Sequence, residues 1–162
     1  YAEGASFSAT IMRFVSVLGP RYTHGHVVDF VAQLLADPTT LRILGDGRQR
    51  KSYLHVADCV AAVASFLEAD HRCEIYNLGV DDYCTVTESA AWICERLGVD
   101  PIREYTGGDR GWVGDNPFIF LDTARVRATG WVPSFSIKEA VEETVDYLVR
   151  EPWILDRSKR SV

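Results

Sequence analysis

Several features that define whole classes of protein are missing from this sequence. No apolar run approaches the roughly 18–20 residues that a helix needs to cross a bilayer, and no signal peptide precedes the first predicted strand. We therefore expect no membrane partner and a cytoplasmic protein. Basic residues are in deficit, with 17 Lys and Arg against 23 Asp and Glu and a formal net charge of −6. This balance argues against a nonspecific nucleic-acid binder, which needs a basic face, but it leaves room for a local basic pocket.

Sulfur-containing residues are also few. The four cysteines, Cys59, Cys73, Cys84 and Cys94, form no CxxC pair. We predict buried free thiols in a reducing compartment rather than a redox motif. The only methionine, Met12, lies inside an apolar run that we interpret as a strand. We therefore expect the chain to begin within a longer protein, through engineering or proteolysis.

What is present is typical of a globular domain, with 47% hydrophobic and 25% charged residues. Hydrophobic periodicity predicts a mixed α/β fold of short strands and helices. The predicted strands are 9–17, 41–44, 48–56 and 75–78, and the predicted helices are 25–37, 58–69, 88–97, 122–129 and 137–150. We expect a single substrate-binding domain over residues 1–155 and a polar tail over 156–162. The apolar strand 9–17 predicts a parallel sheet, most of whose strands would come from a missing amino-terminal half.

Capping residues and apolar stripes define the predicted helices further. Asp58 and Thr87 are predicted N-caps, and Ser136 with Glu139 predicts a capping box for the last helix. Gly98 fits the position just after a helix. The predicted buried stripe of helix 58–69 consists of Val60, Val63, Ala64 and Leu67.

Four motifs, in order, resemble the carboxyl-terminal half of the extended short-chain dehydrogenase/reductase family, the nucleotide-sugar epimerases and dehydratases. Residues 13–20 read RFVSVLGP, similar to R-F-x-N-V-Y-G-P. Residues 41–58 read LRILGDGRQRKSYLHVAD, similar to L-x-I-x-G-D-G-x-Q-x-R-D-[FY]-[VI]-[YH]-V-x-D. Residues 76–79 read YNLG and residues 130–133 read GWVP, as in the family. The resemblance implies a carboxyl-terminal substrate-binding part of a Rossmann-type, NAD(P)-dependent enzyme.

The resemblance also implies which residues bind the substrate, a nucleotide diphosphate-sugar with UDP as the expected nucleotide. Ser16 replaces the family's asparagine that contacts this substrate, and Lys51 replaces its phosphate-binding arginine. Lysine keeps the charge but loses the bidentate fork. Tyr53 lies on the same strand face as Lys51, and Arg110 is expected to substitute for a second family arginine. Phe14 is the predicted contact to the cofactor, NAD or NADP.

The family's catalytic elements are not recognised in this chain. We find no Y-x-x-x-K pair and no GxxGxxG motif, the glycine-rich loop that in the family binds the dinucleotide pyrophosphate at a helix N-terminus. We therefore predict that the parent protein is a UDP-hexose 4-epimerase-like enzyme and that this fragment alone is inactive. A dehydratase or reductase, a noncatalytic or regulatory nucleotide-sugar-binding protein, and a structural fragment that pairs with a separate chain are the alternatives. A homodimer of the full-length protein is left open.

Two other features invite a functional interpretation. The loop 106–118 has no periodicity and contains five Gly or Pro, and loops of this length in compact domains are often functional. Trp112 in this loop is a candidate for stacking on a ligand. His24 and His26 have no Cys or acidic partner at ligand spacing, so we interpret them as ordinary loop or helix-entry residues and predict no metal site.

Overall fold

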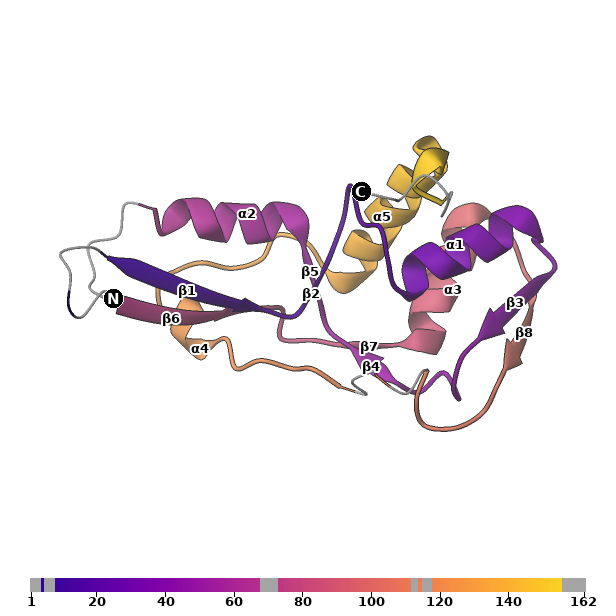
Figure 1. Ribbon diagram of the computed structural model, residues 1–162, viewed down its shortest axis with the longest axis horizontal. Helices are drawn as coiled ribbons and strands as arrows, with labels where there is room; N and C mark the ends of the chain where they lie inside the picture. The colour runs from indigo at the N-terminus through magenta and orange to yellow at the C-terminus, as the bar shows by residue number, and fades with distance from the viewer. Residues whose placement is uncertain (1–3, 5–7, 68–72, 112–113, 115–117, 156–162) are drawn as a thin grey trace.

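A computed structural model describes residues 4, 8–67, 73–111, 114 and 118–155 of the chain. Strands and helices alternate along it, which confirms the predicted mixed α/β class. Figure 1 shows an elongated molecule in which one strand pair, β1 and β6, lies toward one end and a second, β3 and β8, toward the other. Among the described residues no helix is long and apolar enough to cross a membrane.

Within the described residues the strands form four two-stranded ladders rather than one continuous sheet. Three ladders are parallel: β1 (Ala9–Phe14) with β6 (Cys73–Leu78), β2 (Ser16–Leu18) with β5 (Tyr53–His55), and β3 (Thr40–Ile43) with β8 (Ile102–Tyr105). The fourth, β4 (Arg50–Lys51) with β7 (Cys84–Thr85), is antiparallel. Strand β8 lies where the sequence predicted no element.

The predicted strand 9–17 is two strands with different partners. Val15 separates β1 from β2, is 4% exposed, and donates its N–H to the carbonyl of Leu78. The prediction that this strand is buried was wrong for β1, because Ile11 and Phe14 are 47% and 46% exposed. The apolar sequence correctly predicted a strand. It could not indicate that β1 pairs with β6 alone among the described residues.

The described part of the chain also has five helices and one short 3-10 helix: α1 (His26–Ala36), α2 (Val56–Ser65), α3 (Val86–Leu97), α4 (Ala124–Arg127), α5 (Ile137–Arg150) and η1 (Pro152–Leu155). Helices α1, α3 and α5 gather at the end of the molecule that carries β3 and β8, whereas α2 lies along β1 (Figure 1). The core between these helices and the strands includes Leu18, Leu41, Leu54, Ile93 and Leu148, each 0–1% exposed. Burial of these side chains is the main force stabilising this part of the fold.

Predictions for the last helix were confirmed. Helix α5 spans the predicted residues, its N-cap Ser136 forms a capping box with Glu139, and its predicted face is buried. Gly98 ends α3 in the left-handed conformation, at φ 69°. The N-cap prediction for Thr87 was wrong, because Thr85 caps α3 and forms the capping box with Glu88. Helix α3 therefore starts two residues earlier than predicted, inside a stretch whose β-branched residues resemble a strand.

Helix α2 departs most from its prediction. Its N-cap is His55, whose Nδ1 accepts the N–H of Ala57, and not Asp58. Asp58 is 4% exposed, and its two carboxylate oxygens accept the N–H groups of Ser134 at 2.9 Å and Phe135 at 3.1 Å. The predicted buried stripe is exposed, with Val60 at 62%, Val63 at 39% and Leu67 at 78%, and Ala64 is exposed too. The buried residues of α2 are instead Asp58 and Ala62, a carboxylate with fixed partners and a small side chain.

The thiols are free, as predicted, but not all are buried. Cys84 and Cys94 are buried, Cys59 is half-buried and Cys73 is exposed. Cys73 opens β6, where an apolar neighbourhood in the sequence does not become a buried one in space.

Candidate functional site

A cleft of about 1070 Å³ lies between α1 and the strands β2, β4 and β5. Three consecutive odd-numbered residues, Gln49, Lys51 and Tyr53, line it, because alternate residues of an extended chain point to the same side. Ser16 is the ladder partner of Tyr53 and lines the cleft beside it. One wall is therefore a short row of polar side chains on extended backbone.

Backbone hydrogen bonds fix the position of this row. Val86 donates its N–H to the Gln49 carbonyl at 3.0 Å, and β4 pairs with β7 through Arg50 with Thr85 and Lys51 with Cys84. The start of α3 thus holds the strand that carries Gln49 and Lys51. A site on such a frame is more precisely placed than one on a surface loop.

Helix α1 forms the opposite wall and is connected to the strands by side chains. The His26 ring is hydrogen-bonded through Nδ1 to the Tyr53 hydroxyl at 3.1 Å and through Nε2 to the Ser89 hydroxyl at 2.9 Å. Gln33 accepts the N–H of Arg42 at 3.0 Å and donates to its carbonyl at 3.3 Å, which ties α1 to β3. These contacts hold the two walls together and orient the Tyr53 hydroxyl.

The charged side chains of the cleft are more basic than the protein as a whole. Lys51 and Arg42 line it against one carboxylate, Asp29. Burial, reinforced by the nearby Asp29 charge, raises the pKa of Tyr22 to about 12, so this cleft-lining phenol stays neutral and can donate a hydrogen bond at neutral pH. A cleft with two cations and neutral hydroxyl donors suits an anionic ligand that also carries hydroxyl groups.

Gln49 stands apart from the other lining residues. It is 4% exposed, and neither its amide nitrogen nor its amide oxygen has a hydrogen-bond partner in the part of the chain described. The amide lies over Gly45, where an added Cβ would come within 1.8 Å of Gln49 Nε2 and where φ is +80°. The glycine that the sequence indicated as a turn residue therefore also leaves room for this amide.

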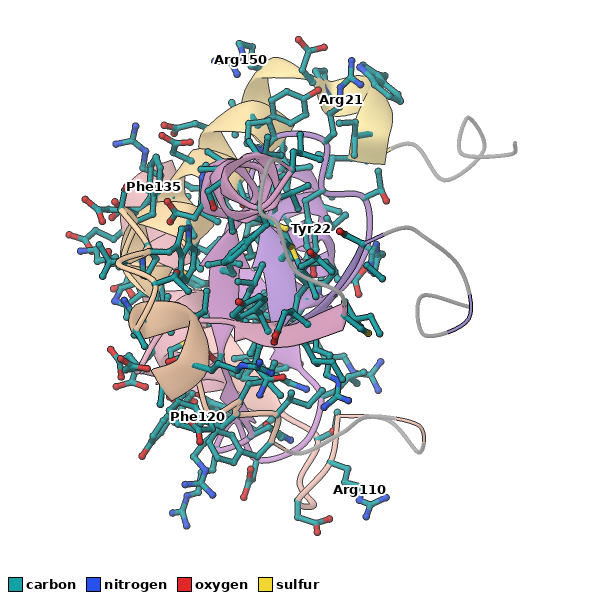
Figure 2. All side chains as sticks on the ribbon, turned by 90° about the vertical axis from the view of Figure 1, so that its left-hand side faces the viewer. Arg21, Tyr22, Arg110, Phe120, Phe135 and Arg150 are labelled. Carbon is teal, nitrogen blue, oxygen red and sulfur yellow. The ribbon has the colours of Figure 1, made fainter. Side chains whose placement is uncertain are left out.

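The structure brings together three of the five predicted site residues. Ser16, Lys51 and Tyr53 line the one cleft, although their role in substrate binding stays a prediction. Arg110 is exposed, is not among the lining residues, and projects at the lower edge of Figure 2, although its neighbour Gly111 lines the cleft. Phe14 is 46% exposed at the end of β1 and also lies outside the cleft, so its cofactor contact is untested.

The loop 106–118 needs one correction. The bare spacing GxxGxxG does occur, at Gly108, Gly111 and Gly114, but it does not have the context that binds a dinucleotide. Such a loop leads from a strand directly into a helix, whereas residues 118–123 are irregular and α4 begins only at Ala124. Trp112 falls outside the described residues.

Sequence reasoning missed several residues of the cleft. His26 was interpreted as an ordinary helix-entry residue, yet it bridges Tyr53 and Ser89. Tyr22, Arg42 and Gln49 were not singled out. Gln49 could have been predicted from the alternation of the strand, because it lies two residues before Lys51 and four before Tyr53 on the same face. The contact between α1 and β5 could not have been predicted from any local sequence pattern. Among the described residues, no group of three His, Cys, Asp or Glu side chains is placed to hold a metal ion.

Comparisons with known proteins agree with this geometry. Residues 1–79 match the family model described as the NAD dependent epimerase/dehydratase family. A solved UDP-galactose 4-epimerase is 32% identical, with a TM-score of 0.79 over 94% of this chain and 50% of its own. A UDP-glucose 4-epimerase from Thermotoga maritima, solved with UDP-glucose, is 27% identical, with a TM-score of 0.78 over 93% and 49%. A mouse dTDP-D-glucose 4,6-dehydratase is 26% identical over 91% of this chain and 42% of its own length.

The matched regions coincide with the motifs found in the sequence. Residues 1–79 contain the first three of the four motifs, including the strands that carry Ser16, Lys51 and Tyr53. The chain spans about half the length of these solved relatives and has their Rossmann-type α/β fold over that half. The first 79 residues therefore match the NAD dependent epimerase/dehydratase family, and most of the chain has the fold of the solved UDP-sugar epimerases it resembles.

Proposed function

We propose that the cleft binds the diphosphate and nucleoside of a UDP-sugar, and that the chain is the substrate-binding half of a UDP-hexose 4-epimerase-like enzyme. The observation that carries this proposal is the convergence of Ser16, Lys51 and Tyr53, the residues of the family motifs, on one cleft. The two similar solved epimerases, one of them solved with UDP-glucose, support the choice of ligand.

Each residue has a distinct part in this proposal. The Lys51 ammonium neutralises the pyrophosphate, with Arg42 contributing a second positive charge at the same cleft. The Tyr53 hydroxyl, oriented by His26, binds a phosphate or sugar oxygen. Ser16, beside Tyr53, contacts the sugar. These interactions position the substrate, which is a large share of what an enzyme contributes to a reaction.

We assign no complete site for the dinucleotide that the family name implies to the part of the chain that the structure describes. No tyrosine has a lysine four positions later in the sequence, and residues 118–123, after the glycines of loop 106–118, are not helical. When bound, NAD or NADP would accept and return a hydride, but we assign none of the described residues to that step. We therefore expect the chain alone to convert no UDP-glucose, and the parent enzyme to interconvert UDP-glucose and UDP-galactose.

Isothermal titration calorimetry of the 162-residue chain with UDP tests the proposal. Lys51→Ala should weaken UDP binding about tenfold or more, because a hydrogen bond to a charged group contributes about 1.5–3 kcal/mol. Lys51→Arg, which restores the family residue, should bind UDP at least as tightly as the unchanged chain. Lys138→Ala is the matched control, because Lys138 lies on α5 and pairs with Glu95 at 3.0 Å. Absence of UDP binding, or an equal loss in the Lys138 variant, would contradict the proposal.

Dehydration is the second candidate reaction, favoured by the similarity to the mouse dTDP-D-glucose 4,6-dehydratase. The two reactions leave different products, a C4 epimer and a 4-keto-6-deoxy sugar. Product analysis by NMR, on a longer protein that also carries the tyrosine–lysine pair, distinguishes them. Formation of a 4-keto-6-deoxy sugar in place of the epimer would replace epimerase with dehydratase and leave the binding proposal intact.

A further inference from the structure

The His26 ring joins three elements of the fold at the wall of the cleft. It opens α1, its Nδ1 is hydrogen-bonded to the Tyr53 hydroxyl on β5 at 3.1 Å, and its Nε2 to the Ser89 hydroxyl on α3 at 2.9 Å. Both partners are buried, Ser89 at 0% and Tyr53 at 3% exposed. A hydroxyl can either donate or accept a hydrogen bond. The ring therefore keeps both of these bonds in either neutral tautomer and as the doubly protonated cation.

The ring of His55 is held in a different way. Its Nδ1 accepts the backbone N–H of Ala57 at 3.2 Å, and its Nε2 lies 3.1 Å from the carboxylate of Glu143. A backbone N–H can only donate, so the Nδ1 of His55 carries no proton while it caps α2. Protonation of His55 at Nδ1 would break that cap, whereas protonation of His26 breaks neither of its hydrogen bonds to hydroxyls. The partners of His26 thus allow it to take up a proton without a change of structure.

The ionisable groups that face His26 come from several elements. Those that line the cleft with it are Asp29 on α1, Arg42 on β3, Lys51 on β4, Tyr53 on β5, and Tyr22 and His24 on the segment before α1. Helix α3 faces it with the Ser89 hydroxyl, because the neighbouring Glu88 carboxylate accepts from Thr85 in the capping box. Helix α5 also packs against α1, but none of its residues lines the cleft.

These charges set the conditions under which His26 takes up a proton. Without a ligand, the cations Lys51 and Arg42 and the positive end of the α1 dipole disfavour an imidazolium at the first residue of α1. Asp29, one turn further along the helix, favours it. A diphosphate in the same cleft adds negative charge and shifts this balance toward the imidazolium.

We propose that His26 is a positioning residue whose protonation is coupled to binding of the nucleotide diphosphate-sugar. The inference rests on the proposed function and goes beyond it by assigning a proton to the binding step. As a cation, His26 donates from both ring nitrogens, so the Tyr53 hydroxyl accepts from Nδ1. The phenol proton of Tyr53 then points away from His26 and can be donated to a ligand oxygen. One proton thus adds a positive charge to the cleft and makes Tyr53 a donor toward the ligand.

Calorimetry with UDP-glucose at several pH values tests the coupling on the unchanged chain. The phosphates of UDP-glucose are both diesters, whereas the terminal phosphate of UDP would itself titrate, with a second pKa of about 6. The affinity should be about fivefold or more higher at pH 5.5 than at pH 8, because a histidine ordinarily titrates near pH 6.5 and the imidazolium attracts the diphosphate. At pH 7, titrations in buffers of different ionisation enthalpy should show uptake of part of a proton. Equal affinities without proton uptake overturn the inference.

Two histidine variants locate the proton. His26→Gln should abolish the pH dependence and the proton uptake together, whereas the loss of a purely structural contact would lower the affinity equally at both pH values. His24→Gln is the matched control, because His24 lines the same cleft two residues before His26. This variant should keep both effects. Proton uptake that is lost in the His24 variant, or retained in the His26 variant, overturns the assignment.

NMR of the His26 ring provides a measurement that does not depend on a folded His26 variant. The ¹⁵N shifts of the two ring nitrogens distinguish the cation from the neutral tautomers. At pH 7, UDP-glucose should move the signals of the unchanged chain toward those of the cation. Binding that leaves the ring neutral refutes the coupling and leaves the proposed function intact. A chain that binds no UDP-glucose at any pH refutes the proposed function and this inference with it.

Discussion

Replacement of Asp58 by asparagine distinguishes two roles that this carboxylate can have in the fold. Asparagine and aspartate are nearly equivalent N-caps, so Asp58→Asn would change the free energy of unfolding by a few tenths of a kcal/mol if Asp58 capped α2. In the structure, however, its two oxygens accept the N–H groups of Ser134 and Phe135 at 2.9 and 3.1 Å. An asparagine has one oxygen and must present its NH₂ group to the second N–H.

The expected cost follows from this geometry. Asp58→Asn loses one charge-assisted hydrogen bond and weakens the other, which we expect to cost about 1.5–3 kcal/mol. Asp58→Ala removes the acceptor of two part-buried N–H groups and should cost about 2–5 kcal/mol. Both values are large against the total stability of a domain, typically about 5–15 kcal/mol.

Urea unfolding followed by circular dichroism measures both differences. Ser136→Asn is the matched control, because Ser136 is a true N-cap and asparagine should cost only a few tenths of a kcal/mol there. If Asp58→Asn lowers the free energy of unfolding no more than Ser136→Asn does, the hydrogen bonds from Ser134 and Phe135 to Asp58 do not stabilise the fold, and the prediction is wrong.

Two further predictions concern the cysteine thiols. Burial first, then the charges of Glu88 and Asp82, raises the pKa of Cys84 to about 12 from 9.0, so the folded state holds this proton more tightly than the unfolded state. The free energy of unfolding should therefore fall as pH rises from about 9 toward 12, and Tyr22 should add to the fall above pH 10. In urea titrations between pH 8 and 10, Cys84→Ala should make the free energy of unfolding depend less on pH. An unchanged slope in this variant would contradict the prediction. Exposed Cys73 should react with a thiol reagent in the native protein, whereas Cys84 should react only on unfolding, and equal labelling rates would show that Cys84 is accessible.

The sequence predicted best the elements that are defined by local chemistry. The capping box at Ser136 and the heptad-like face of α5 follow from side chains within one segment, and the helix bounds were correct. The glycine after α3 is likewise a local requirement for a left-handed residue. The motif residues Lys51 and Tyr53 could be assigned to one face because alternation along a strand is also local.

Tertiary contacts explain the predictions that failed. The apolar stripe of α2 is exposed because none of the described residues covers it. The spacing of apolar residues within a helix does not indicate where other elements lie. In the sequence Asp58 has the position and side chain of an N-cap. Only the structure shows that the loop at residue 134 donates a backbone N–H to it. His26 and Gln49 are 23 residues apart in sequence. They could be recognised as cleft residues only from the structure, in which α1 faces the strands across the cleft.

The parallel ladders have a consequence for biosynthesis. Ladder partners are far apart in the chain: Ala9 pairs with Cys73, Ser16 with Tyr53 and Thr40 with Ile102, separations of 64, 37 and 62 positions. A topology with such a high contact order folds slowly, because long loops must close before the contacts that reward closure can form. At a translation rate of 5–20 residues per second, β1 waits roughly 3–13 s for its partner strand to be synthesised. During that interval its apolar edge is open to pairing with other chains, so this protein should depend on low nascent-chain density or chaperone protection early in synthesis.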